Sequence, residues 1–150
     1  MKALVGLKEF WHKYSETWVG TVIYIIVGFI IALSLHIALQ YVLHTSAPVV
    51  AVFSDSMVPT FYKGDMMFVR SYYDGESMEI GDIIVFEADR PYPIIHRVYN
   101  ITLNGIMTKG DNNPSADPWL TPVKNIYGKV ILKVPLLGWL KIIQVRLVSF

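Results

Sequence analysis

Apolar residues run almost without interruption through the first part of the chain, whereas later they occur in short bursts between turn-forming residues. No Asp, Glu, Lys or Arg occurs between Thr17 and Ser54. At about 1.5 Å per residue, a helix over residues 18–44 is longer than the ~30 Å hydrocarbon core of a bilayer. The pattern predicts one transmembrane helix over residues 18–44. A cleaved signal sequence is disfavoured, because its apolar part usually has only about 7–15 residues.

Positively charged residues predict the orientation of this helix. The first basic residue after the helix is Lys63, whereas three lysines precede it: Lys2, Lys8 and Lys13. Because basic residues gather on the cytoplasmic side of membrane helices, we expect residues 1–17 to form a cytoplasmic segment. Residues 45–150 should then form a domain outside the cell or inside a secretory lumen.

Three polar residues recur every fourth position near the end of the predicted helix, namely His36, Gln40 and His44. This spacing predicts that they share one helix face. They could form a metal or proton-relay stripe, or a polar edge that contacts the outer domain or a partner helix. We favour the polar edge, because glutamine is a poor metal ligand.

After residue 45 the pattern is typical of a mainly β domain with antiparallel strands. Asn104-Gly105 predicts a hairpin with a type I′ turn. The C-terminal apolar stretch is too short to cross a membrane again, so it should be an amphipathic segment on the membrane or a strand that packs into the core. The predicted strands are Val49–Phe53, Met66–Arg70, Asp82–Glu87, Ile94–Leu103, Ile106–Lys109 and Lys124–Val134.

Composition excludes several classes of function. With 53% hydrophobic and 17% charged residues the chain is not intrinsically disordered, and a net charge of +1 disfavours nucleic acid as a partner. The chain has no cysteine, which excludes disulfides, thiolate zinc sites and cysteine nucleophiles. Hydrolytic chemistry would therefore need an activated hydroxyl or a metal.

Three sites could together supply an activated hydroxyl. Residues 54–60, Ser-Asp-Ser-Met-Val-Pro-Thr, follow a predicted strand and form a proline-constrained turn. His96 lies within a predicted strand, and residues 109–117 form a loop with two carboxylates. Taken singly, these sites could be an ordinary turn, a structural histidine and a set of Asx turns or a weak calcium loop formed by Asp111, Asn113 and Asp117.

The order and spacing of these motifs resemble the type I signal peptidases, in the archaeal and endoplasmic-reticulum branch. The resemblance implies a signal-peptidase-like β domain and a membrane-anchored serine endopeptidase that removes signal peptides after small residues, through an acyl-enzyme and without a cofactor. It also implies that Ser56 is the nucleophile and His96 the base, with Asp111 and Asp117 both involved. The matching segments are residues 54–60, 81–86, 96–98 and 109–113, together with Asp117.

Within this resemblance, we favour Asp117 as the partner of His96. The oxyanion hole would consist of the Ser56 backbone N–H and the Ser54 hydroxyl, by similarity to the bacterial branch. Asp55 stands where relatives often have glycine. Because a carboxylate beside a developing oxyanion would destabilise it, we expect Asp55 to face water.

Two alternatives compete with this hypothesis, a serine–lysine peptidase with Lys109 or Lys63 as the base, and a membrane-anchored β scaffold without catalysis. The partners expected are preproteins with signal peptides, the lipid bilayer and other membrane subunits. Four apolar residues could either contact lipid or belong to the core: Met57, Phe61, Tyr72 and Tyr73.

Overall fold

The computed structural model describes residues 17–72, 76–90 and 92–148. The chain divides into two compact units, the first ending at Leu39 and the second beginning at Gln40. The predicted cytoplasmic segment, apart from Thr17, lies outside the described residues, as does Tyr73.

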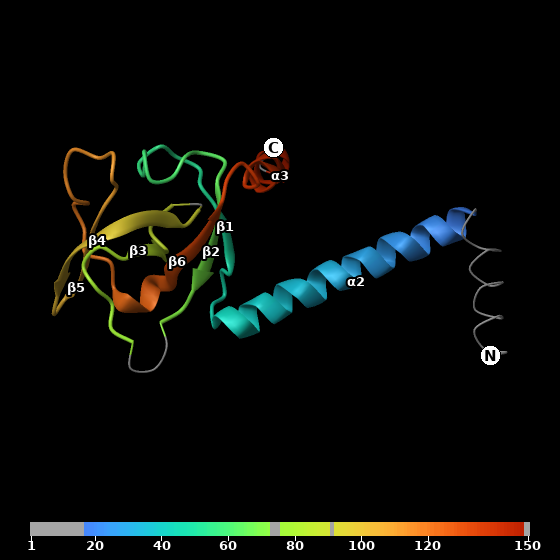
Figure 1. Ribbon diagram of the computed structural model, residues 1–150, viewed down its shortest axis with the longest axis horizontal. Coiled ribbons are helices and arrows are strands. Elements are labelled where there is room, and N and C mark those ends of the chain that lie inside the picture. The colour runs from blue at the N-terminus through green and yellow to red at the C-terminus, as the bar shows by residue number, and fades with distance from the viewer. Residues whose placement is uncertain (1–16, 73–75, 91, 149–150) are drawn as a thin grey trace. The chain divides into compact units, whose positions relative to one another are not determined.

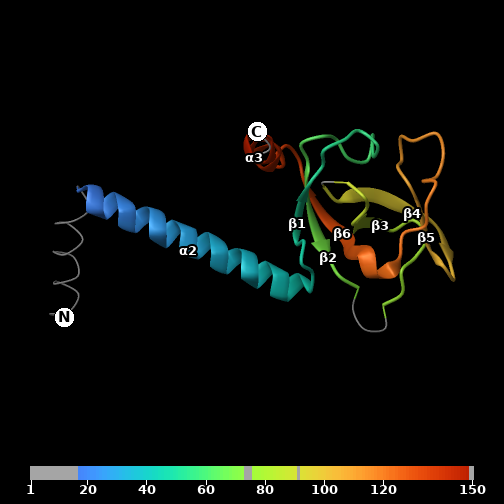
Figure 2. The ribbon, with the colours of Figure 1, turned by 180° about the vertical axis from the view of Figure 1, so that it is seen from behind.

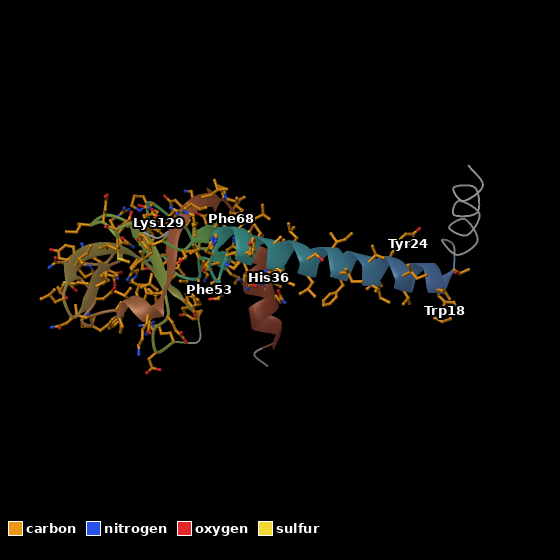
Figure 3. All side chains as sticks on the ribbon, turned by 90° about the horizontal axis from the view of Figure 1, so that it is seen from below. Trp18, Tyr24, His36, Phe53, Phe68 and Lys129 are labelled. Carbon is orange, nitrogen blue, oxygen red and sulfur yellow. The ribbon has the colours of Figure 1, made fainter. Side chains whose placement is uncertain are left out.

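The first unit consists of most of helix α2, Trp18–Leu43. The helix has a mean hydropathy of 2.6, and none of its most apolar window is buried. Trp18 and Tyr24 point outward from its surface (Figure 3). The predicted membrane-spanning helix therefore forms, one residue shorter than expected, and it is long and apolar enough to cross a bilayer.

The predicted polar stripe is not continuous. His44 has a positive φ of 50° and lies just after the helix ends. Gln40 donates a side-chain hydrogen bond to the Ser46 carbonyl, at 3.2 Å. The prediction that all three residues share one helix face was wrong, because the chain leaves the helix before the third.

The second unit contains a six-stranded sheet in the order β1-β2-β6-β3-β4-β5, in which every neighbouring pair is antiparallel. The predicted mainly β fold is therefore confirmed, although the strands are shorter at several ends than expected. Their bounds are β1 Val49–Ala51, β2 Met66–Arg70, β3 Ile83–Phe86, β4 Ile94–Thr102, β5 Gly105–Lys109 and β6 Ile126–Val134.

Alternating side chains of these strands form two buried apolar clusters. One joins residues of β1 and β2 to Met57 and Phe61, which are 1% and 6% exposed. The other is centred on Ile84 and Phe86 of β3. Tyr72 packs against the second cluster. Met57 and Phe61 therefore belong to the core, and the alternative that they contact lipid is wrong.

Two loops that carry candidate residues rise at the same end of the sheet. Figure 1 shows the loop after β1 in green and the loop after β5 in orange, and Figure 2 shows them from behind. A backbone hydrogen bond of 2.8 Å from Asn112 to the Ser56 carbonyl joins the two loops. Segments far apart in sequence therefore meet at this end.

Two local predictions need correction. The hairpin between β4 and β5 forms, but only Gly105 has a positive φ, 148°, so the turn is not type I′. Residues Val123–Asn125 form a 3-10 helix, η1, so β6 begins two residues later than predicted. The C-terminal stretch forms helix α3, Trp139–Val148, which excludes the alternative of a strand.

Candidate active site

Ser56 lies in the turn after β1, and buried neighbours anchor this turn. The Phe61 N–H donates to the Met57 carbonyl at 2.9 Å, and the Val58 N–H donates to the Asp55 carbonyl at 3.2 Å. Ser56 is half-buried, whereas Asp55 is exposed, as we expected for a carboxylate beside a reacting serine. The core fixes the turn from one side while the serine hydroxyl remains accessible.

His96 connects Ser56 to Asp117. Its Nε2 lies 3.1 Å from Ser56 Oγ, and its Nδ1 lies 2.6 Å from Asp117 Oδ2. The His96 and Asp117 side chains are 8% and 6% exposed. A neutral imidazole with its proton on Nδ1 satisfies both contacts, because Nδ1–H then donates to the carboxylate and Nε2 accepts from the serine hydroxyl. The structure thus brings together one candidate from each of the three sites.

Thr108 bonds to the same carboxylate oxygen of Asp117 as His96 does. Its hydroxyl donates to Asp117 Oδ2 at 2.6 Å, and the Asp117 N–H donates to the Thr108 carbonyl at 2.8 Å. Sequence reasoning missed this residue. The sequence pattern could have indicated it, because Thr108 lies two residues after Ile106 in β5 and therefore faces the core on the same side of the strand. A buried hydroxyl at such a position needs a partner.

Asp111 contacts a different set of residues and does not reach His96. Arg97 donates to both of its carboxylate oxygens, from Nε at 2.9 Å and from the second terminal nitrogen at 2.7 Å. Thr60, at the end of the Ser56 turn, donates to Oδ2 at 2.6 Å. Arg97 also donates to the Gly81 carbonyl at 2.9 Å. Asp111 therefore ties the Ser56 turn to β4.

The hydrogen bonds from Arg97 keep the pKa of Asp111 below its ordinary value of 3.8. The hydroxyl of Thr60 and the charges of Arg97 and Lys109 lower the pKa in the same direction, while burial opposes them. Asp111 is therefore a carboxylate whose ionised form is stabilised by fixed donors. This environment suits a structural anion better than a group that exchanges protons.

The loop after β5 lies close against the Ser56 turn. The Asn112 N–H donates to the Ser56 carbonyl, and its side-chain amide donates to the Asp55 carbonyl at 3.2 Å. A Cβ added at Gly110 would lie 2.7 Å from the Ser56 carbonyl oxygen. Glycine therefore permits a contact that any side chain would displace.

The two donors that the resemblance assigns to the oxyanion hole are the Ser56 N–H and the Ser54 hydroxyl. Within the described part of the chain, the Ser56 N–H donates no hydrogen bond. The hydrogen bonds of Ser56 are formed by its carbonyl and its hydroxyl. Ser54 Oγ lies 3.2 Å from Ser56 Oγ. Both groups named as oxyanion donors from the resemblance therefore lie next to the serine hydroxyl.

The alternative candidates, which are the lysine bases and the calcium ligands, are not brought together around Ser56. Among residues 17–72, 76–90 and 92–148, no lysine amino group, including those of Lys63 and Lys109, hydrogen-bonds to Ser56. No cluster of three metal-ligating side chains occurs among the same residues. Asp111 and Asp117 are each engaged by protein donors of their own, which does not favour a shared calcium site.

A cleft of about 340 Å³ leads to this constellation. Its lining includes residues 51–54 and residues 92–96, which lead into β4. Phe53 and Tyr92, which both line the cleft, stack with their ring centroids 5.2 Å apart. The cleft therefore places Ser56, His96 and Asp117 in one concave site, as is typical of sites that bind a substrate.

Comparison with known proteins agrees with this geometry. A model of the family described as Peptidase S24-like matches residues 29–131, which include all the candidate residues. The signal peptidase complex catalytic subunit SEC11 of Fusarium vanettenii is 33% identical over 117 residues, covering 70% of this chain and 68% of the relative. This chain belongs to the signal peptidase family. A second SEC11 subunit, from Komagataella phaffii, is 34% identical to this signal peptidase over 125 residues, 70% of this chain and 71% of the relative.

Membership makes this signal peptidase a hydrolase and confirms the resemblance found in its motifs. The non-catalytic scaffold is correspondingly disfavoured, because the relatives are named as catalytic subunits. The apolar helix α2 fits a protein held in the membrane by a single span.

Proposed function

We propose that this signal peptidase removes N-terminal signal peptides from preproteins with Ser56 as nucleophile, His96 as general base and Asp117 as the group that orients His96. The observation that carries the proposal is the continuous chain of hydrogen bonds, 3.1 Å from Ser56 Oγ to His96 Nε2 and 2.6 Å from His96 Nδ1 to Asp117 Oδ2. Distances of about 2.6–3.2 Å are those required for proton transfer between nucleophile and base.

In the first half of the reaction Ser56 Oγ attacks the carbonyl carbon of the scissile peptide bond. His96 Nε2 accepts the hydroxyl proton and then donates it to the leaving amine nitrogen as the carbon–nitrogen bond breaks. The products are an ester between Ser56 and the signal peptide, and the free amino terminus of the mature protein. Asp117 stabilises the imidazolium without itself taking the proton.

In the second half water hydrolyses the ester. His96 Nε2 accepts a proton from the water, whose oxygen attacks the ester carbon, and returns a proton to Ser56 Oγ. During both halves the Ser56 N–H and the Ser54 hydroxyl stabilise the negatively charged oxygen. The absence of another acceptor for the Ser56 N–H among the described residues supports this role. Loss of one such donor typically lowers the rate about 10²–10³-fold.

Asp111 is a positioning residue in this proposal. Its bonds to Thr60 and Arg97 fix the turn that carries Ser56 relative to the strand that carries His96. Since a displacement of about 1 Å costs roughly 10²-fold in rate, this link contributes to catalysis without contacting the substrate.

The cleft supports selection for small side chains beside the scissile bond. The apolar residues Val52, Ile94 and Ile95 line the same cleft as Ser56, and Val52 and Ile95 belong to the packed core. We expect bulky residues next to the cut to raise KM and lower kcat.

The arrangement in the membrane is a further part of the proposal. The lysines before helix α2 support a cytoplasmic N-terminal segment, residues 1–17, and a domain, residues 45–150, outside the cell or in the secretory lumen. The relatives are named as subunits of a signal peptidase complex, which supports association of this chain with other membrane subunits. Protease accessibility in sealed vesicles tests the orientation.

Cleavage of a model preprotein in detergent tests the function. Ser56→Ala and His96→Ala should each lower kcat by at least about 10³-fold, while Ser115→Ala, in the exposed part of the loop after β5, and His36→Ala should leave it unchanged. Wild-type cleavage by the Ser56 variant would refute the proposal and favour a scaffold. Wild-type cleavage by the His96 variant would favour a lysine base.

A further inference from the structure

Asn113 adds a further polar side chain to the catalytic cleft. It lines the cleft together with Ser56, His96 and Asp117, and it is half-buried. Three other polar residues line the cleft outside the catalytic hydrogen bonds, and they are exposed to water: Arg90, Tyr92 and Trp119. Among the described residues of the cleft, Asn113 is therefore partly shielded from water without belonging to the proposed catalytic chain.

The backbone around Asn113 holds this residue in place. Its N–H donates to the Gly110 carbonyl at 3.0 Å. The next residue is Pro114, and a proline favours extended conformations for the residue before it. A Cβ added at Gly110 would lie 2.8 Å from Asn113 Nδ2 and 2.7 Å from the Ser56 carbonyl oxygen. The loop therefore fixes the Asn113 side-chain amide close to the residue that carries the nucleophile.

The hydrogen-bonding groups of this amide are unused. Within the described ranges only the backbone of Asn113 forms hydrogen bonds, whereas the side-chain amide of its neighbour Asn112 donates to the Asp55 carbonyl at 3.2 Å. An asparagine side chain offers two N–H donors and one carbonyl acceptor. In an extended chain the N–H and the carbonyl of one residue point to the same side. One asparagine can therefore pair with both main-chain groups of one substrate residue.

This inference rests on the proposed function. We propose that Asn113 binds the main chain of the preprotein in the catalytic cleft, with Nδ2 donating to a substrate carbonyl and Oδ1 accepting from a substrate N–H. The pairing does not involve substrate side chains, so it contributes equally to preproteins of different sequence. Asn113 is thus a substrate-binding residue and takes no part in proton transfer.

Asn113→Leu tests the contact, because leucine is similar in size to asparagine and removes both hydrogen-bonding groups. The substrates are two model preproteins with different residues on either side of the cut. We expect KM to rise about threefold to tenfold for both, the effect of losing about one neutral hydrogen bond, with kcat unchanged. An unchanged KM, a loss confined to kcat, or a rise in KM for one preprotein alone would overturn the proposal.

Asn100→Leu is the matched control. Asn100 is an exposed asparagine of β4 that does not line the cleft, so this variant should cleave both preproteins with wild-type KM and kcat. The melting temperature of each variant reports whether it folds. If Asn113→Leu does not fold, Asn113→Ala, which removes the same groups without adding apolar surface, replaces it with the same expected result.

Substrates with a single ester in place of a peptide bond identify the main-chain contact. An ester lacks the N–H of the bond that it replaces. In a set of synthetic signal-peptide substrates with one ester each, we expect one position at which the ester raises KM about threefold to tenfold for the wild type and has little effect for Asn113→Leu. Equal ester effects in the two enzymes at every position would refute the contact, because a purely structural role of Asn113 does not depend on the substrate main chain.

These outcomes separate Asn113 from the proposed function. If Ser56→Ala still cleaves the preprotein, the proposed function fails. If the wild type cleaves through Ser56 but the Asn113 variant binds both preproteins and all ester substrates as the wild type does, only the inference about Asn113 fails.

Discussion

Asp117 and Asp111 belong to the same loop, and each accepts a hydrogen bond of 2.6 Å from a threonine, yet their surroundings differ. Asp117 is bonded to a histidine that contacts Ser56, and the side chains of Asp117 and this histidine are both buried. Asp111 is bonded to an arginine, whose side chain is 37% exposed, and joins two structural elements. In the proposed mechanism the second partner therefore distinguishes the two aspartates: Asp117 orients the histidine that serves as base, and Asp111 positions the turn that carries Ser56.

Asp117→Asn should give the largest effect. An asparagine side chain can donate to His96 Nδ1 and so favour the tautomer with the proton on Nε2, which cannot accept the Ser56 proton. We expect kcat to fall about 10³–10⁴-fold, as occurs when a catalytic triad has the wrong tautomer. Steady-state cleavage of a preprotein measures the loss, and circular dichroism checks the fold.

Asp111→Asn should have a smaller effect on rate and a larger one on stability. We expect kcat to fall about 10–100-fold through displacement of the Ser56 turn. The free energy of unfolding should decrease by about 1–2 kcal/mol. The loss is no larger because Arg97 is partly exposed, and water weakens its ion pair with Asp111. If Asp111→Asn lowered kcat as much as Asp117→Asn without loss of stability, the distinction between the two aspartates would be wrong.

The two threonines allow the same comparison with milder substitutions. Thr108→Val removes a donor from Asp117 and should lower kcat about tenfold, whereas Thr60→Val removes a donor from Asp111 and should lower kcat about threefold or less. Equal losses in the two variants would contradict the account. Each variant keeps the size of the side chain, so the measured differences reflect the hydroxyls.

The smallest effect that we expect is a change with pH in the stability difference between wild type and Asp111→Asn. The pKa of Asp111 is lower in the folded state than its ordinary value of 3.8. The stabilisation is therefore fully present above about pH 4 and is lost as the pH falls through the folded pKa. Urea unfolding from pH 6 downward should show the two proteins converging below about pH 4. A difference that stays constant to the lowest pH would exclude ionised Asp111 as its source.

Much of this molecule could be predicted from its sequence because the patterns are local. The uncharged stretch predicted helix α2, and turn residues flanking apolar bursts predicted the six strands to within a few residues. The helical C-terminal segment was not predicted, because apolar residues interrupted by Lys141 and Arg146 fit both a helix and a strand.

The candidate site could be predicted only in part. Motif order identified Ser56, His96 and the two aspartates, but the sequence does not show which carboxylate faces His96, since both lie in one loop of turn-forming residues. The roles of Thr108, Thr60 and Arg97 depend on register between strands and on contacts between loops. Such contacts arise from tertiary packing and leave no periodic signal.

The central claim is that Asp117 acts through His96 and that His96 acts on Ser56. Single-turnover cleavage of a preprotein by wild type, His96→Ala, Asp117→Asn and the double variant tests it most directly, with products quantified by mass spectrometry. We predict that Asp117→Asn lowers the rate about 10³-fold or more in the wild type and has almost no further effect when His96 is already absent. An equal loss in both backgrounds would contradict the account.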